Sequence, residues 1–246
     1  MSTQPDSPGI SVVVPVCNEA ENVEPLAREI HAALAQSSYE MIFVDDGSTD
    51  DTVAILLRLR QELPALRVLR HSFRSGQSAA VSSGVRAARA AWVATLDGDG
   101  QNDPADIPKL IAARDDPSNR GVQLFQGNRK ASRKDTAWRK LQSSIANGVR
   151  SSLLDDATPD TGCGIKLFAR EVFLEVPRFD HMHRFMPALF MRQGARVISV
   201  PVGHRPRTRG TSKYGMLNRV FVGIVDIAGV MWLRRRFKPG LLVRED

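Results

Sequence analysis

The sequence has few of the residues that mark several common classes of protein. Its 246 residues include two cysteines, Cys17 and Cys163, which lie far apart and without metal-ligand spacing, so neither a disulfide framework nor a zinc site is expected. Aromatic residues make up only 6%, and no helix-turn-helix, zinc-finger or RNA-binding motif occurs, so nucleic acid is not an expected partner. Residues 1–9 lack the basic start and apolar core of a secretory signal. A cytoplasmic protein is therefore expected.

Long apolar runs are also absent. The stretch 220–233 has 14 residues and contains Asp226, whereas a membrane-spanning helix needs about 20 apolar residues. It ends in Trp232 and a cluster of cations that reaches Lys238, a pattern typical of a helix lying at an anionic membrane surface. An ordinary core helix with a basic end is the alternative. We expect a peripheral protein on the inner face of the cell membrane, for which a separate integral membrane protein could supply the spanning helices.

Charge is distributed unevenly along the chain. The net charge is +7, but residues 1–119 hold 10 Lys and Arg against 17 Asp and Glu, whereas residues 120–246 hold 24 against 10. An acidic half can hold a cation, and a basic half can hold phosphates or approach an anionic membrane. This asymmetry indicates a phosphate-containing ligand or an anionic membrane surface as the partner of the basic half.

Strand and helix patterns alternate through the first half of the chain. Apolar runs predict strands at 10–16, 41–44, 66–69 and 92–96, and helices at about 18–35, after Thr49 or Asp50, and at 78–91. Such alternation favours an α/β fold with a mostly parallel sheet and helices on both faces. Further strands are expected at 122–127, 166–169 and 195–200, and helices at 137–154, 184–192 and 217–236. We expect one main domain, 1–216, and a C-terminal basic amphipathic helix, 217–246.

Two carboxylates stand at the end of the fourth predicted strand. Asp97 and Asp99 flank Gly98, and Asp103-Pro104 then has the pattern of an N-cap and a first helical turn. Ligands of open α/β sheets bind at this edge, and Mg²⁺ or Mn²⁺ is commonly held there by one or two carboxylates and substrate phosphates. A solvated Asp-Gly turn is the alternative.

Polar residues also end the first two predicted strands. Asn18-Glu19 follows the first strand and Asp45-Asp46 follows the second, so all these groups should converge at one edge of the sheet. Capping is the alternative explanation, and Asn18 with Glu21 has the pattern of a capping box.

Three ordered motifs resemble those of the family 2 glycosyltransferases. They are Val14-Pro15-Val16-Cys17-Asn18-Glu19, Val44-Asp45-Asp46-Gly47-Ser48-Thr49-Asp50 and Asp97-Gly98-Asp99-Gly100-Gln101. A fourth, Arg207 to Lys213, matches the family's Arg-x-x-Gly-x-Ser-Lys. Within the family the chain is similar to the polyprenyl-phosphate (dolichol-phosphate) mannose synthase group, over about residues 10–215.

The resemblance implies a nucleotide-sugar-binding sheet of the glycosyltransferase A type and assigns roles by position. Nucleotide-sugar contacts are implied at Pro15, Cys17, Glu19, Val44, Asp45, Asp46, Asp97, Gly98, Asp99, Arg129, Arg207 and Lys213. Metal ligands are implied at Asp97, Asp99 and Gln101, and the catalytic residues are implied to be Asp99, Arg207 and Lys213. The family often has an aromatic residue at Cys17 and an alanine at Gly98, so base stacking at the first position is in doubt.

The resemblance also implies a site for the acceptor. Arg139 and Ser143 stand four apart and so share a helix face, and a matching Arg and Ser hold the acceptor phosphate in the lipid-phosphate synthases. Asp160 matches a residue near the sugar and is expected to contact the sugar or the acceptor. A solvated helix face is the alternative for the first pair.

The resemblance implies an inverting enzyme that moves a hexose from a nucleotide-sugar to a polyprenyl phosphate. Transfer to a saccharide or protein acceptor is an alternative, but such relatives use a Glu-Asp pair that is missing from residues 150–200. A catalytically silent nucleotide- or lipid-binding module is another. A Rossmann dehydrogenase is excluded because no Gly-x-Gly-x-x-Gly follows the first strand. No catalytic histidine is expected, and His181 and His183 are interpreted as loop residues.

Overall fold

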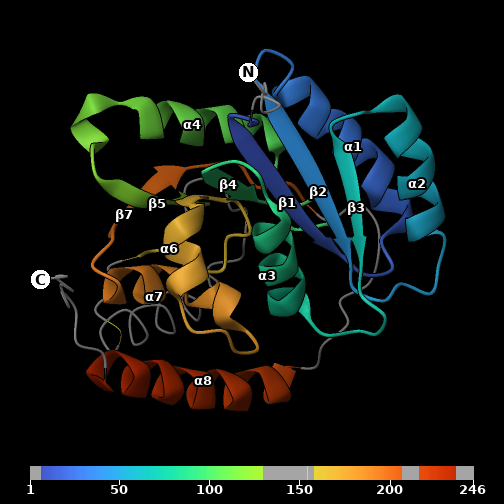
Figure 1. The fold of residues 1–246 in the computed structure, drawn as a ribbon. Helices are drawn as coiled ribbons and strands as arrows, with labels where there is room; N and C mark the ends of the chain where they lie inside the picture. The colour runs from blue at the N-terminus through green and yellow to red at the C-terminus, as the bar shows by residue number, and fades with distance from the viewer. Residues whose placement is uncertain (1–6, 130–153, 155–157, 207–215, 237–246) are drawn as a thin grey trace, which may run out of the picture.

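The computed structural model describes residues 7–129, 154, 158–206 and 216–236. They form one seven-stranded sheet between two layers of helices (Figure 1). The strands are β1 (Ile10–Val16), β2 (Tyr39–Asp45), β3 (Leu66–Arg70), β4 (Trp92–Thr95), β5 (Val122–Asn128), β6 (Lys166–Ala169) and β7 (Arg196–Pro201). The helices are α1 (Ala20–Ala33), α2 (Thr52–Glu62), α3 (Gln77–Ala87), α4 (Ile107–Asp115), α6 (Arg170–Glu175), α7 (Met186–Arg192) and α8 (Met216–Arg236), with 3₁₀ turns at Pro104–Asp106, Pro117–Asn119 and Met182–Arg184.

The strand order is β3-β2-β1-β4-β6-β5-β7, and the pairing is mostly parallel. The exception is β6, which runs antiparallel to both β4 and β5. The predicted α/β class, with a mostly parallel sheet in a single domain, is confirmed. The reversal of β6 brings Lys166, at its first residue, beside Thr95 at the end of β4.

The core consists of two apolar layers, one on each face of the sheet. In β1, Val12 and Val14 belong to the layer with α1, α2 and α4, whereas Val13 belongs to the layer with α3, α6, α7 and α8. Because successive side chains of a strand point to opposite faces, a continuous β-branched run is what a strand covered on both sides needs. The expectation of helices on both faces is therefore confirmed.

Two helix ends differ from the prediction, and in both cases a distant residue is the reason. Asn18 does not cap α1: it adopts a left-handed backbone, with φ 55°, and its Oδ1 accepts a hydrogen bond from the Thr49 backbone N–H at 2.7 Å. The Asp50 carboxylate accepts instead from the N–H of Ala20. Helix α3 ends at Ala87 rather than at residue 91, because the next N–H groups donate to Glu40 and Ser11.

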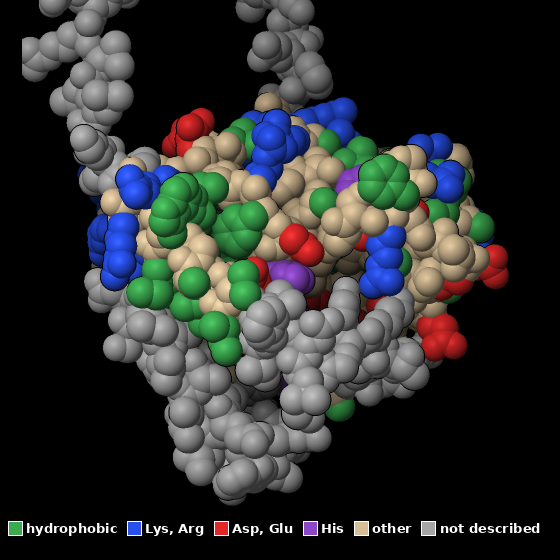
Figure 2. All heavy atoms as spheres, turned by 90° about the horizontal axis from the view of Figure 1, so that it is seen from below, with side chains coloured by type: hydrophobic (Ala, Val, Ile, Leu, Met, Phe, Trp, Pro, Cys, Tyr) green, Lys and Arg blue, Asp and Glu red, His purple; other side chains and the backbone are tan. Residues whose placement is uncertain are grey.

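Helix α8 lies along the lower side of the molecule in Figure 1 and has two unlike faces. Val230 is fully buried and packs with Ile227 and Met231 against the core layer that contains α7. The solvent-facing side of α8 exposes large apolar side chains, namely Ile224, Val225 and Trp232. Figure 2, which looks at the molecule from below, shows hydrophobic side chains beside Lys and Arg on this side. None of the described helices is long and apolar enough to cross a membrane.

Candidate functional site

The two carboxylates of the Asp-Gly-Asp motif lie just beyond the end of β4, where contacts from neighbouring loops fix them. Asp97 Oδ1 accepts a hydrogen bond of 2.8 Å from Gln77 Nε2, at the start of α3. The backbone N–H of Asp97 donates to Asn102 Oδ1 at 3.0 Å, and Asp99 Oδ1 accepts from the N–H of Gln101 at 3.1 Å. The strand-end position predicted for this pair is confirmed, and the loop 97–102 is closed by its own side chains.

The electrostatics of this pair fit a divalent cation. Withdrawal from solvent, and next the charge of Asp99, raise the pKa of the Asp97 carboxyl. A cation between the two carboxylates would remove this repulsion and restore the ionised form. Within the described residues no group of three His, Cys, Asp or Glu could hold a metal. Two carboxylates suit Mg²⁺ or Mn²⁺, which is commonly bound by one or two carboxylates together with substrate phosphates.

Gly164 is packed directly against this pair. A Cβ atom at position 164 would overlap the Asp97 carboxylate and the Asn102 side-chain oxygen. Thr95 Oγ1 also donates to the carbonyl of Gly164 at 2.9 Å, which holds the loop before β6 against β4. The absence of a side chain at Gly164 therefore sets the position of Asp97.

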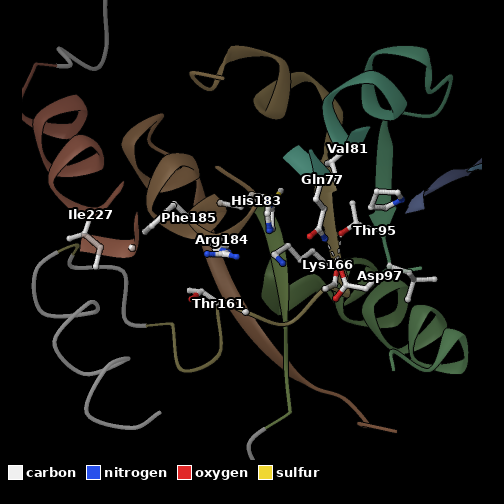
Figure 3. A pocket seen from close by; sticks show the side chains of 16 residues that line it. Gln77, Val81, Thr95, Asp97, Thr161, Lys166, His183, Arg184, Phe185 and Ile227 are labelled. Carbon is white, nitrogen blue, oxygen red and sulfur yellow. Dashed lines mark hydrogen bonds between the residues drawn. The ribbon is translucent and has the colours of Figure 1, made fainter. Parts of the chain in front are cut away.

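A cavity of about 530 Å³ opens beside Asp97 (Figure 3). Gln77, Asp97 and Lys166 lie at one side of it, and Phe185 and Ile227 lie at the other. The full lining is Pro15, Gln77, Val81, Thr95, Leu96, Asp97, Thr161, Gly162, Gly164, Lys166, His183, Arg184, Phe185, Met186, Gly223 and Ile227. The site is thus polar near the carboxylates and apolar toward α8.

Four polar lining residues were not predicted from the sequence: Gln77, Lys166, His183 and Arg184. His183 lies in the connecting turn Met182–Arg184, as expected of a loop residue, but its Nδ1 lies 2.8 Å from Ser78 Oγ and it borders the cavity. The one available signal was a lysine opening an otherwise apolar strand at Lys166. His181 instead pairs with Asp226 of α8, at 3.1 Å.

Arg129 and Asp160 form one buried unit. Arg129 Nε and Nη2 donate to the two Asp160 oxygens at 2.8 and 2.9 Å, and its backbone N–H also donates to Oδ2. The pair raises the pKa of Arg129 above its usual value against the effect of burial, so the guanidinium stays charged. Both Asp160 oxygens accept from Arg129, so Asp160 supports this cation beside Gly162, and its predicted contact with the sugar or acceptor stays a prediction.

The aspartates after β2 hold loops together. The Asp45 carboxylate accepts from the N–H of Ser48, and Asp46 accepts from His71 Nδ1 and from the N–H groups of Ser75 and Gly76. These hydrogen bonds lower the pKa of Asp46 despite its burial. Asp46 therefore fixes the loop that leads into α3, and so the position of Gln77.

The other residues predicted to contact the nucleotide differ in their exposure. Pro15 lines the cavity, and Cys17 is half-buried just after β1. Glu19 Oε2 accepts from Asn22 Nδ2 at 2.7 Å. The side chain of Val44 is fully buried and faces Gly84 of α3, so it is not available to a nucleotide. Gly98 is required locally, since a Cβ there would approach the Pro15 carbonyl oxygen to 2.8 Å.

Part of the predicted site lies outside the described residues, namely Arg139, Ser143, Arg207 and Lys213. The segment that leads to the last two is anchored to the carboxylate loop. The Arg205 N–H donates to the Gln101 carbonyl at 3.1 Å, and its guanidinium pairs with Asp103 and Glu29, each at 2.7 Å.

The sequence of this chain is similar to those of known proteins. The family model described as Glycosyl transferase family 2 matches residues 11–176. The dodecaprenyl-phosphate galacturonate synthase of Rhizobium johnstonii is 35% identical over 237 residues, which are 94% of this chain and 69% of that protein. The undecaprenyl-phosphate 4-deoxy-4-formamido-L-arabinose transferase of Edwardsiella ictaluri is 31% identical over 217 residues, 86% of this chain and 64% of that protein. This chain thus spans about two thirds of each relative.

Solved structures share the fold. Glucosyl-3-phosphoglycerate synthase from Mycobacterium tuberculosis, in complex with Mn²⁺, UDP and glucosyl-3-phosphoglycerate, matches with a TM-score of 0.67 and 20% identity over 92% of this chain and 80% of that one. The same enzyme with Mg²⁺ and UDP matches equally well. The fold is therefore of the glycosyltransferase A type. Since the family model covers more than half of the sequence, the chain belongs to glycosyl transferase family 2 and is a glycosyltransferase.

Proposed function

We propose that this enzyme transfers a sugar from a nucleotide-sugar to a polyprenyl phosphate at a membrane surface, with inversion at the anomeric carbon. The observation that carries the proposal is the graded cavity, with Asp97 at one side and Phe185 and Ile227 at the other. This lining suits a charged donor that meets an acceptor with a phosphate head and an apolar chain. The relatives that are named for dodecaprenyl and undecaprenyl phosphate support the same acceptor class.

In this proposal Asp97 and Asp99, with Gln101, hold Mg²⁺ or Mn²⁺. When bound, the metal supplies positive charge to the diphosphate of the donor. Arg129, which Asp160 keeps charged, adds a fixed cation close enough to Asp97 to affect its pKa. Arg207 and Lys213 are proposed to neutralise the departing diphosphate, which is where negative charge develops during the transfer.

The acceptor phosphate needs little help to act as a nucleophile. Its oxygen attacks the anomeric carbon from the face opposite the diphosphate, and a phosphate dianion has no proton to lose. His183, which borders the described cavity, is not suited to act as a general base. Burial and the nearby Lys166 and Arg184 charges lower its pKa to about 3. Such an imidazole is too weak a base to serve as a general base. Arg139 and Ser143 are proposed to contact the acceptor phosphate, and positioning carries most of the catalysis.

The proposal is tested by comparing a polyprenyl phosphate with the corresponding free polyprenol as acceptor, in the presence of Mn²⁺ and a nucleotide-sugar. Glycolipid should form only from the phosphate. Equal transfer to the alcohol, or transfer to a saccharide alone, would contradict this acceptor class.

The basic loop provides the first prediction. Changing Arg207 or Lys213 to alanine is expected to lower kcat by about 10²–10³-fold, the scale seen when one transition-state donor is lost. Affinity for the nucleoside diphosphate should weaken less, because these cations act mainly on charge that develops during transfer. Steady-state kinetics and nucleotide titrations measure the two effects. Unchanged kinetics in both variants would make this loop an ordinary solvated surface.

Helix α8 provides the second prediction. We propose that its exposed Ile224, Val225 and Trp232, followed by Arg234–Arg236, bind the enzyme to the cytoplasmic face of the membrane, with or without an integral membrane partner. Each cation near an anionic surface contributes about 1 kcal/mol, and salt screens it. The enzyme should therefore sediment with anionic vesicles at low salt and be partly released at high salt.

Changing Arg234, Arg235 and Arg236 together to glutamate should abolish this sedimentation and leave metal-dependent nucleotide binding intact. If the wild-type enzyme does not sediment with anionic vesicles at low salt, α8 is instead a core or partner-docking helix.

A further inference from the structure

Two basic side chains, those of Lys166 and Arg184, line the middle of the cavity. Lys166 opens β6, is only 4% exposed and donates from Nζ to the Cys163 carbonyl. Arg184 borders the same space from the turn before α7. Among the described lining residues Asp97 is the one carboxylate, and it is assigned to the metal. Burial lowers the pKa of Lys166, whereas the charges of Asp97 and Asp160 raise it, so an anionic ligand that enters here would further favour the ammonium form.

His183 adds a third polar side chain to this group, and Ser78 engages its Nδ1. Ser78 Oγ accepts a hydrogen bond from the backbone N–H of His183, and it also lies 2.8 Å from the ring Nδ1. We assign the hydroxyl as the donor to Nδ1, and with this assignment the proton of the neutral ring lies on Nε2. With its pKa lowered to about 3, the ring stays neutral at ordinary pH. His183 therefore offers the cavity an N–H, not an acceptor.

The three donors lie together, between the carboxylate side and the apolar side of the cavity. The charges of both Lys166 and Arg184 reach His183, and Figure 3 shows the three side chains grouped between Asp97 and Phe185. On the far side, Phe185 and Met186 before and in α7, and Ile227 of α8, form an apolar wall. A ligand that fits this order has a compact anionic head followed by a hydrocarbon chain.

We propose that Lys166, Arg184 and His183 also contact the phosphate of the acceptor, beyond the contacts proposed for it above, with the first isoprenoid units against Phe185, Met186 and Ile227. This inference rests on the proposed transfer to a polyprenyl phosphate and assigns that acceptor a place among the described residues. The phosphate oxygens accept from the ammonium, the guanidinium and the imidazole N–H.

Binding of farnesyl phosphate, with farnesol as the uncharged probe, tests the inference without any need to know the donor. Calorimetry on the wild-type enzyme should show much tighter binding of the phosphate than of the alcohol. Lys166→Met and Arg184→Gln should each weaken the binding of farnesyl phosphate by about 10- to 100-fold, the scale of one hydrogen bond to a charged group. The affinity for farnesol should stay unchanged. Arg178→Gln is the matched control, because this exposed arginine lines a separate groove.

Lys166 is buried, so its loss could disturb folding. Lys166→Arg, which keeps the charge, should retain most of the affinity for farnesyl phosphate, and thermal unfolding shows whether each variant is folded. Arg184 is less buried and provides an independent variant. Two folded variants that bind farnesyl phosphate as well as the wild type would overturn the inference.

The assigned proton position of His183 has its own test. Glutamine can place its amide N–H near the position of Nε2, whereas asparagine can satisfy Ser78 but does not reach into the cavity. His183→Gln should therefore bind farnesyl phosphate more tightly than His183→Asn. The reverse order would show that the contact with Ser78, and not the N–H toward the cavity, is what matters.

Kinetics with the active donor separate this inference from its alternatives. The variants should raise KM for the acceptor and leave KM for the nucleotide-sugar near the wild-type value. If KM for the donor rises while farnesyl phosphate binding is unchanged, the cluster binds an anionic group on the donor sugar and the inference is wrong. If farnesyl phosphate binds as described but no glycolipid forms with any donor, the proposed function fails while the phosphate site stands.

Discussion

Changing Asp99 to asparagine is expected to lower kcat by about 10²–10³-fold and to remove the metal dependence of nucleotide binding. Asparagine keeps the size of the side chain and an oxygen that can accept from the Gln101 N–H, so the loop should stay folded. What is lost is one of the two negative charges that would hold Mg²⁺ or Mn²⁺ next to the diphosphate. Turnover with and without EDTA, and nucleotide titrations with and without Mn²⁺, measure both effects.

Asp103→Asn is the control for this variant. Asp103 lies four residues away in the same loop, but its carboxylate caps the next turn by accepting from the N–H of Ala105 and pairs with Arg205. Asparagine is also a good N-cap residue, and Glu29 still pairs with Arg205 in this variant, so kcat should change little. Full activity of Asp99→Asn in EDTA would show that the carboxylate pair is not a metal site.

Gly164→Ala is expected to have an effect of similar size although it removes no functional group. The added methyl would overlap the Asp97 carboxylate and the Asn102 side chain, so Asp97 must move from its contact with Gln77. Displacement of a metal ligand by about 1 Å is enough to cost about 10²-fold in rate. Activity should fall, and the Mn²⁺ concentration needed for half-maximal activity should rise.

Gly162→Ala is the matched control, two residues earlier in the same loop. A Cβ there meets its nearest neighbours, Arg129 Nη2 and Asp160 Oδ1, at 3.7 and 3.9 Å, which is ordinary contact. Its activity and metal requirement should stay within a few-fold of the wild type. Equal metal requirements in the two alanine variants would show that the packing of Gly164 does not position Asp97.

The sequence predicts the half of the site that comes from strand ends. A continuous apolar run followed by Asp-Gly-Asp places the carboxylates at the sheet edge, because strand direction and strand end are local properties. The expected strand 166–169 is confirmed, but its antiparallel direction is not visible in its pattern. That direction is what brings Lys166 next to Thr95 and into the cavity.

The rest of the site depends on contacts between residues that are far apart in the chain. Ser78 and His183 are 105 residues apart, and neither has a neighbour in sequence that indicates the pairing. Asn18 has the local pattern of a helix cap, yet Thr49 takes its side-chain oxygen and Asp50 supplies the acceptor for α1. Local propensity does not determine which of several distant partners a polar side chain binds. The sequence therefore does not predict which cations line the cavity.

We propose that the enzyme forms a glycolipid from a nucleotide-sugar and a polyprenyl phosphate. The most direct measurement incubates the enzyme with a polyprenyl phosphate, Mn²⁺ and each member of a donor panel: GDP-mannose, UDP-glucose, UDP-galactose, UDP-N-acetylglucosamine and UDP-galacturonate. We predict glycolipid from at least one donor, abolished by EDTA and by Asp99→Asn. Donor turnover that yields only free sugar or a glycosylated saccharide, with no glycolipid from any donor, would contradict the claim.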